Sequence, residues 1–246
     1  MKLLSYLQKT KHVTRREFLT MLQEEVLQIN DTPVTDFSQE INANDTLKIK
    51  LPDGKFYTEH VKSLPTYRPK LVLFNKPTGY VVSKDDPHNK TIYDVLPKHR
   101  KEQLYYIGRL DKDSSGLLLL TNDTSLVDYY ENPKNNVYKV YEVRIDAGWK
   151  AKDSKKAKFG IWVTEQGDVA QDNERAELLS AVSITYHYIK NQHMLVVTLT
   201  EWKKRHIRRL LKALWYKTMD LKRIKIGKRM LGTLKPGKRR IETKAL

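Results

Sequence analysis

The sequence predicts an α+β protein, because strand-like and helix-like patterns occupy separate stretches of one chain. Residues 71–74 and 117–120 are continuous apolar runs, and residues 137–145 largely alternate apolar and polar side chains, as buried and half-buried strands do. Residues 201–216 instead carry apolar side chains at helical spacing. A third observation is a change of character near residue 52, which divides the chain into a small and a large part.

The stretch at residues 52–70 contains three prolines and lacks an apolar period, so we interpret it as connecting sequence. The chain of 246 residues is long enough for a large domain plus a small one. We predict a small module at residues 1–60, a linker at 61–70 and the large domain at 71–246.

The small module begins with a helix. Thr14-Arg15-Arg16-Glu17 has the form of a capping box, and Leu19, Leu22 and Val26 follow on one predicted helical face. Short strands are predicted on both sides of a turn at Asn30-Asp31, and a half-buried strand over residues 47–51. Helices followed by a short hairpin resemble an RNA-binding module shared by a small-subunit ribosomal protein and several RNA-modifying enzymes. The alternative is an ordinary α/β appendage.

Positive charge is concentrated near the end of the sequence. The formal net charge is +17, and residues 201–240 hold 16 Lys or Arg with 2 acidic residues. All other residues together hold 30 basic and 27 acidic side chains. Solubility alone does not require such concentration, so we expect a polyanionic partner. The lysine-rich residues 150–158 we interpret as a solvated loop.

Several classes of protein and site are disfavoured. The sequence has no cysteine, which excludes disulfides, thiolate nucleophiles and cysteine-based zinc sites. The scattered histidines give no metal-ligand spacing, and no apolar run approaches the roughly 20 residues of a membrane span. The first residues have no signal-peptide pattern. We therefore expect a cytoplasmic protein without a metal.

The first candidate site is the polar loop before the apolar run at 117–120. It contains Asp111, with Arg109 and Lys112 close in sequence. Loops held by rigid strands are favoured places for catalytic side chains, and a cationic neighbour keeps a partly buried carboxylate ionised. The alternative role for Asp111 is to form a turn or cap.

Two further segments carry candidate residues. The strand at 137–145 places Lys139 and Tyr141 on a mostly apolar face, where a tyrosine can stack on a base or simply fill the core. The predicted helix at 201–216 has its apolar side chains on one face and several arginines and a lysine largely on the others. One arginine could turn inward to a carboxylate while the rest contact phosphates, although such a helix can also be only a surface helix.

Residues 71–241 resemble the ribosomal-RNA pseudouridine synthases that carry an N-terminal RNA-binding module. The resemblance lies in an ordered set of motifs: Asn75-Lys76-Pro77-Thr78-Gly79, Gly108-Arg109-Leu110-Asp111 with Ser115-Gly116-Leu117-Leu118, Lys139-Val140-Tyr141, Arg205-His206-Ile207-Arg208-Arg209-Leu210, and the closing Leu221–Gly227 and Leu231–Gly237. The chain departs from the family around Trp202-Lys203-Lys204, where glycine is usual, and at His206, where glutamine is usual.

This resemblance implies a catalytic domain with a mixed, largely antiparallel sheet flanked by helices. It also implies that Asp111 attacks or deprotonates the target uridine, that Tyr141 stacks on the uracil, and that Arg208 pairs with Asp111. The residues expected to contact RNA are Lys76, Arg109, Lys139, Arg205, Arg209, Lys222, Arg223 and Lys225. No cofactor is implied.

The expected partner is ribosomal RNA or a ribosomal subunit assembly intermediate, and the expected state is a monomer. The alternative function is a non-catalytic RNA-binding or ribosome-assembly factor with the same fold. That alternative explains the charge equally well, but it does not require Asp111, Tyr141 and Arg208 to occur together.

Overall fold

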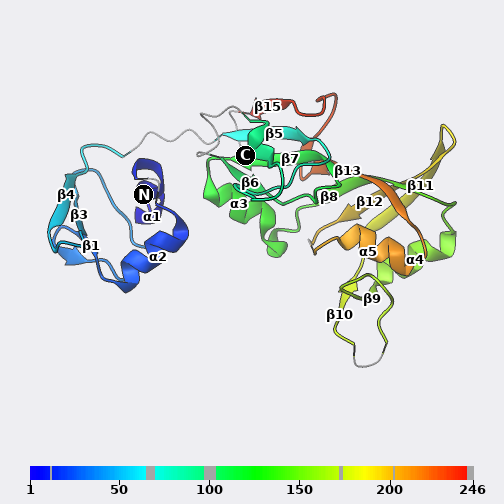
Figure 1. Cartoon of the computed structure of the whole chain (residues 1–246), viewed down its shortest axis with the longest axis horizontal. Coiled ribbons are helices and arrows are strands. Elements are labelled where there is room, and N and C mark those ends of the chain that lie inside the picture. Colours follow the sequence, from blue (N-terminus) through cyan, green and yellow to red (C-terminus); the bar gives the residue numbers. More distant parts are fainter. Residues whose placement is uncertain (12, 65–69, 97–103, 172–173, 202, 243–246) are drawn as a thin grey trace. The chain divides into compact units, whose positions relative to one another are not determined.

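The computed structural model describes the chain apart from residues 12, 65–69, 97–103, 172–173, 202 and 243–246. Its contacts divide the chain into two compact units, Met1–Arg68 and Pro69–Leu246 (Figure 1). Part of the stretch interpreted as a linker, residues 65–69, lies outside the described residues.

The first unit packs two helices against a four-stranded antiparallel sheet of strand order β2-β1-β3-β4. Its elements are α1 Leu3–Thr10, α2 Arg15–Gln23, β1 Leu27–Ile29, β2 Thr32–Pro33, β3 Thr46–Lys50 and β4 Phe56–His60. The predicted capping box is confirmed, because the Thr14 side chain accepts from the Glu17 N–H and the Glu17 carboxylate accepts from the Thr14 N–H. Asn30 and Asp31 both have positive φ, which gives the tight turn that joins β1 to β2.

Two predictions for this unit are wrong. Leu19 does not face the core, because it is 42% exposed and Phe18 is the buried residue of α2. Residues 56–60 are strand β4 rather than connecting sequence, and the core of the unit extends to Val61. The strand has little apolar pattern because its side chains are mostly exposed, and its backbone pairing with β3 supplies the order.

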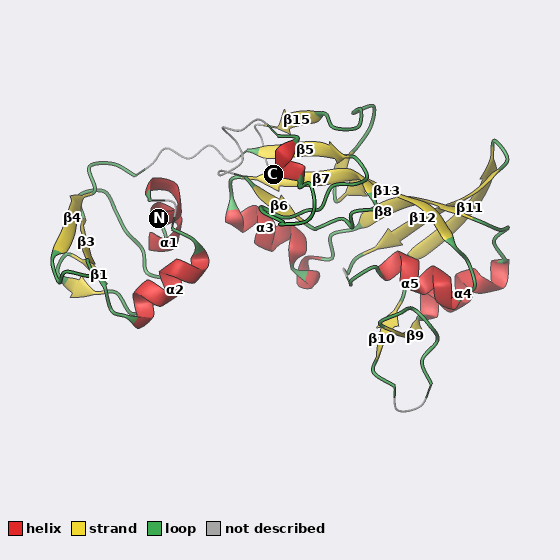
Figure 2. Ribbon diagram, in the orientation of Figure 1, coloured by secondary structure: helices red, strands yellow, loops and turns green. Residues whose placement is uncertain are grey.

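The second unit is built on a nine-stranded sheet of order β11-β12-β8-β13-β7-β5-β15, with β6 beside β7 and β14 beside β13 (Figure 2). Its strands are β5 Leu71–Lys76, β6 Tyr105–Ile107, β7 Ser115–Thr121, β8 Lys139–Ile145, β11 Ser183–Ile189, β12 Gln192–Leu199, β13 Thr218–Ile226, β14 Arg229–Met230 and β15 Arg239–Glu242. A separate hairpin consists of β9 Ile161–Thr164 and β10 Ala176–Leu179. The helical elements are η1 Ile92–Asp94, α3 Thr124–Glu131, η3 Pro133–Asn135, α4 Ala151–Phe159 and α5 His206–Ala213.

The pairs in the large sheet are antiparallel except β7 with β13, which run parallel. The α+β fold with a mixed, largely antiparallel sheet is therefore confirmed. Residues 117–120 of β7 are all apolar because the sheet is covered on both faces there. Leu118 and Leu120 join a core that includes residues of α5, whereas Leu117 and Leu119 join a core that includes residues of α3.

Residues 150–158 do not form a loop, because Ala151–Phe159 is helix α4. Asp153 and Ala157 lie one helical turn apart and are both buried, and the Asp153 carboxylate accepts a hydrogen bond from the Tyr216 hydroxyl at 2.8 Å. The predicted helix at 201–216 is shorter than expected, because Arg205 and Trp215 on either side of α5 have positive φ. Across the described part of the chain, no helix is long and apolar enough to span a bilayer.

Candidate active site

The loop that carries Asp111 leads from β6 into β7, in the middle of the large sheet. Gly108 begins it with a φ of 64°, and the Ser114 N–H donates to the Asp111 carbonyl at 3.1 Å to close a turn. The Gly108 N–H also donates to the Glu131 carboxylate of α3 at 2.7 Å. The Asp111 side chain is half-buried, so its carboxylate is held near the core and remains accessible to a substrate.

Lys76, the last residue of β5, holds the backbone of this loop through hydrogen bonds from its side chain. Its side chain is fully buried, and its Nζ donates to the carbonyl oxygens of Ser114 at 2.7 Å and Asp111 at 3.0 Å. Further carbonyls, those of Pro77 and Lys112, lie at 3.1 and 3.4 Å. Burial lowers the pKa of Lys76 to about 8, although the nearby carboxylates of Asp113 and Asp111 act in the opposite direction. The ammonium therefore holds backbone, and is not available to phosphate.

Arg223 of β13 fastens the other end of the same loop. It is fully buried, and donates from Nε to the Leu117 carbonyl and from Nη2 to the Gly108 carbonyl, both at 2.7 Å. Desolvation by burial lowers the pKa of Arg223, and the neighbouring Tyr141 raises it through its charge and a side-chain hydrogen bond. The guanidinium thus joins the loop before β7 to the strand that carries Tyr141.

Tyr141 lies on β8, directly across from Arg223 on β13. The predicted alternation is confirmed, since Lys139, Tyr141, Val143 and Ile145 are all buried. Burial raises the pKa of Tyr141, Arg223 lowers it, and the charge of Asp111 raises it by a smaller amount. The charge of Asp111 thus acts on the Tyr141 hydroxyl, with a smaller effect than burial or Arg223.

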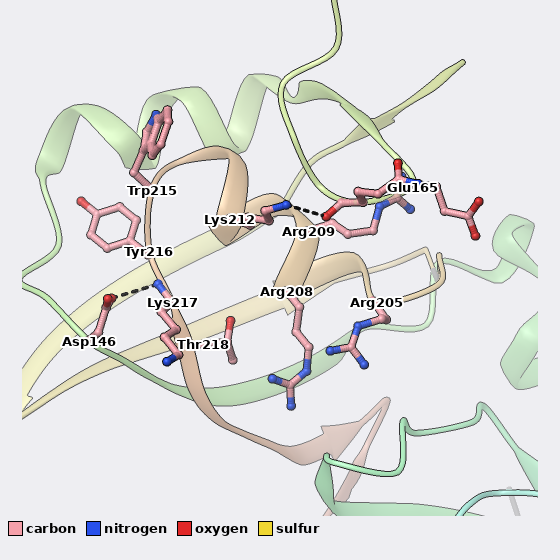
Figure 3. A pocket seen from close by; sticks show the side chains of 11 residues that line it. Asp146, Glu165, Arg205, Arg208, Arg209, Lys212, Trp215, Tyr216, Lys217 and Thr218 are labelled. Atoms are coloured by element: carbon pink, nitrogen blue, oxygen red, sulfur yellow. Dashed lines mark hydrogen bonds between the residues drawn. The ribbon is translucent and has the colours of Figure 1, made fainter. Parts of the chain in front are cut away.

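Arg208 was predicted to pair with Asp111, but it pairs with Asp113 instead. Arg208 Nη2 lies 3.2 Å from the Asp113 carboxylate and 3.2 Å from the Asp113 carbonyl, and Arg205 Nη2 lies 3.3 Å from the same carboxylate. Across the described residues no ion pair joins either arginine to Asp111. Figure 3 shows the side chains of Arg208 and of Arg205, just before α5, extending in the same direction. The start of the helix thus contacts the loop two residues beyond Asp111.

Four residues that were expected to contact RNA are buried and bonded within the protein, namely Lys76, Lys139, Arg209 and Arg223. Lys139 Nζ donates to the carbonyls of Val137 and Thr200 at 3.3 Å, and burial lowers its pKa to about 8. Arg209 donates to the Thr164 carbonyl at 2.8 and 3.0 Å and forms an ion pair with Glu177 at 2.6 Å. These residues hold elements together, and the RNA contact proposed for each is corrected accordingly.

The other expected RNA contacts, Arg109, Arg205, Lys222 and Lys225, are exposed or half-buried. Trp202, where the sequence departs from the family, lies outside the described residues. The positioning roles of Lys76 and Arg223 were missed although a signal existed. Lys76 shares a strand face with the apolar Val72 and Phe74, and Arg223 shares one with Leu221, so strand alternation already placed both cations inward.

The arrangement places an accessible carboxylate on a loop whose backbone is held at both ends by buried cations. The charge of Asp111 influences the Tyr141 hydroxyl, and Arg205 and Arg208 at the start of α5 contact the same loop through Asp113. Such a site can present one carboxylate oxygen in a fixed direction to a substrate carbon or proton. No group of three or more potential metal ligands occurs within the described residues.

A family model described as RNA pseudouridylate synthase matches residues 70–213. The ribosomal large subunit pseudouridine synthase B of Buchnera aphidicola subsp. Baizongia pistaciae is 30% identical over 91% of this chain and 86% of its own. The ribosomal small subunit pseudouridine synthase A of Vibrio parahaemolyticus is 29% identical over 76% of this chain and 77% of its own. A solved structure of a pseudouridylate synthase covers 98% of this chain and 96% of its own, with a TM-score of 0.63 and 23% identity.

Proposed function

The chain belongs to the RNA pseudouridylate synthase family, and from this premise we propose that it converts a specific uridine of ribosomal RNA into pseudouridine, with Asp111 acting directly on the target nucleotide. Relatives named for the large and for the small ribosomal subunit support ribosomal RNA as the substrate class. The observation that carries the proposal is Asp111 itself, half-buried on a loop fastened by Lys76 and Arg223.

The reaction breaks the bond between the ribose C1′ and the uracil N1, turns the uracil, and joins C1′ to C5. The proton lost from C5 is balanced by one gained at N1, so no oxidant, group donor or cofactor is needed. Asp111 attacks C1′ or removes a proton from the nucleotide. Tyr141 stacks on the uracil and assists the loss of the C5 proton; because its ring is 1% exposed, the side chains that cover it must move when the nucleotide enters. The target base must leave its stack first, which costs a few kcal/mol.

Arg208 we propose as a positioning residue. Its contacts with the carboxylate and carbonyl of Asp113 support a role in fixing the loop from the side of α5, with Arg205 assisting. The exposed Arg109 is proposed to help extrude the nucleotide, and Lys222 and Lys225 to contact phosphates.

The small unit at residues 1–60 we propose as an additional RNA-binding module, with Arg15 and Arg16 exposed at the start of α2. The substrate is ribosomal RNA or a subunit assembly intermediate, so we place the enzyme in the cytoplasm. We propose that it acts as a monomer, which light scattering would report as a particle of 28.9 kDa.

Asp111→Asn tests the proposal. The variant keeps the size of the side chain and removes the nucleophilic, basic oxygen, so we expect pseudouridine formation in unmodified ribosomal RNA to fall to background. RNA affinity is expected to stay or rise slightly, because a carboxylate facing a polyanion opposes binding. Chemical labelling maps the product, and filter binding gives the affinity.

Asp123→Asn is the matched control, since Asp123 follows β7 at its opposite end and caps α3 through the Ser125 N–H at 2.9 Å. Asparagine caps a helix as well as aspartate does, so activity is expected to be unchanged. Wild-type activity in a folded Asp111→Asn protein would contradict the assignment. The non-catalytic alternative would be favoured if the wild-type protein binds RNA tightly but forms no pseudouridine in either naked RNA or assembly intermediates.

A further inference from the structure

Trp215, just past the end of α5, carries two unfavourable features. Its side chain is 93% exposed, so the large apolar indole gains almost nothing from burial. Its φ is 66°, in the left-handed region where bulky side chains are strained. A residue that combines an exposed apolar side chain with a strained backbone is expected to have a role other than stabilising the fold.

The turn that presents Trp215 is held firmly. The Trp215 N–H donates to the Lys212 carbonyl and the Tyr216 N–H to the Leu211 carbonyl, both at 2.9 Å. The Tyr216 hydroxyl donates to the Asp153 carboxylate of α4 at 2.8 Å and accepts from the Lys150 N–H at 3.1 Å. The backbone from which the indole projects is therefore fixed at the surface.

Trp215 borders a pocket of about 520 Å³, a volume typical of small-ligand sites. Figure 3 shows Trp215 at one end of the lining residues and Arg205 and Arg208 toward the other, with Lys212 and Lys217 between them.

The charge of the pocket is positive. Its lining includes five Lys or Arg against two acidic residues. Several of these cations already have protein partners, such as Lys212 with Asp168 at 2.9 Å. Lys217, next to Trp215 and Tyr216, forms no ion pair among the residues that the structure describes. An exposed aromatic ring at the edge of a positively charged pocket is the chemistry that recognises a base and its phosphate.

We propose that this pocket binds a nucleotide of the substrate RNA, with its base stacked on Trp215 and its phosphate facing the cations of the pocket. The inference rests on the proposed function, which supplies the RNA strand. Arg208 connects the two sites, because it lines the pocket and also holds Asp113, two residues from Asp111.

Trp215→Gly is the deciding variant, because glycine adopts a φ of 66° without strain and the melting temperature is therefore expected to stay or rise. The probes are a fluorescein-labelled oligouridylate of about 12 nucleotides and an abasic RNA oligomer of the same length. We expect the Kd for oligouridylate, measured by anisotropy, to rise roughly 5- to 100-fold and the Kd for the abasic oligomer to stay unchanged. Trp215→Phe should recover most of the affinity.

Trp162→Ala is the matched control, since Trp162 is 59% exposed on β9 and does not line the pocket. An unchanged Kd for oligouridylate in Trp215→Gly, or an equal loss with the abasic oligomer, would overturn the stacking site. The outcomes separate the two proposals. Pseudouridine formation with unaltered binding in Trp215→Gly sinks only the subsite, whereas base-dependent loss of affinity in a protein that makes no pseudouridine sinks only the proposed function.

Discussion

At the scale of single residues, the site depends on cations that are not directed at solvent. The Lys76 ammonium exchanges water for backbone carbonyl oxygens. Its pKa is lowered to about 8, because the effect of burial exceeds that of the nearby carboxylates of Asp113 and Asp111. Because the same carbonyls belong to the residues around Asp111, the geometry of the loop and the stability of the core depend on one side chain. A substitution of Lys76 would therefore lower both together.

His206 provides a prediction about pH. Its imidazole is buried, and Nε2 donates to the Ser180 carbonyl at 2.9 Å. Burial lowers its pKa from 6.5 to about 4. Between pH 6.5 and about pH 4 the imidazole is protonated in the unfolded chain but stays neutral in the folded chain. The free energy of unfolding therefore falls as the pH falls through this range. The contribution is at most about 1.4 kcal/mol per pH unit in this window.

His206→Gln keeps an N–H group that can donate to the Ser180 carbonyl but does not titrate. We expect its free energy of unfolding to decline less steeply with acid than that of the wild type, with the two curves parallel above about pH 7. Urea unfolding at intervals from pH 4 to pH 7 provides the comparison. Curves that stay parallel through the whole range would show that the imidazole is not the group responsible.

At the scale of elements, the parallel contact between β7 and β13 brings the Asp111 loop and Arg223 together. Gly116 lies opposite Arg223 in this register, with a φ of 103°. A Cβ at Gly116 would lie 2.2 Å from the Arg223 carbonyl oxygen, and this backbone atom cannot move aside without parting the strands. Only glycine therefore allows β13 to approach closely enough for its guanidinium to reach the loop.

Gly116→Ala is expected to lower the free energy of unfolding by about 3 kcal/mol or more, since backbone overlap adds to the strain of positive φ. Gly79→Ala is the matched control. Gly79 has a similar φ of 88°, but a Cβ there meets nothing within 4 Å, so only the strain of about 1 to 2 kcal/mol remains. Denaturant midpoints measure both. Equal losses would mean that the β7–β13 spacing adapts to a methyl group.

The elements also show how far the sequence could be interpreted. Period-two alternation placed Tyr141 inside, and the continuous apolar run predicted β7, because both patterns are local. The cations of Lys76 and Arg223 were assigned to RNA because charge was taken to mean exposure. Strand alternation places both cations inward, but it does not identify the carbonyls that accept their hydrogen bonds, because these lie up to 115 residues away in the chain. Helix α4 was missed for a similar reason, since its buried Asp153 is satisfied by Tyr216, 63 residues later.

At the scale of the whole molecule, the two units differ sharply in charge. Residues 1–68 carry 10 Lys or Arg and 9 Asp or Glu, whereas residues 69–246 carry 36 and 20. Nonspecific affinity for a polyanion follows net positive charge, so it is expected to come from the second unit. The first unit, nearly neutral, would have to contribute through particular contacts.

We predict that the first unit folds independently, with β4 as an obligatory part. A chain of residues 1–64 keeps β4 and the buried Val61, whereas a chain of residues 1–55 loses both and leaves the edge of β3 unpaired. A unit of this size is only marginally stable, so the loss should abolish folding. Circular dichroism on heating is expected to give a cooperative transition for the longer chain only. A cooperative transition in both would make β4 dispensable.

The distance in sequence between β7 and β13 has a consequence for the newly made protein. Arg223 must reach the Leu117 carbonyl across 106 residues, which translation at about 5 to 20 residues per second supplies only after roughly 5 to 20 seconds. Throughout that interval the loop can form its contacts with Lys76 and Glu131, but not those of Arg223 with the Gly108 and Leu117 carbonyls. If Asp111 acts as proposed, we expect a chain interrupted before β13 to be inactive.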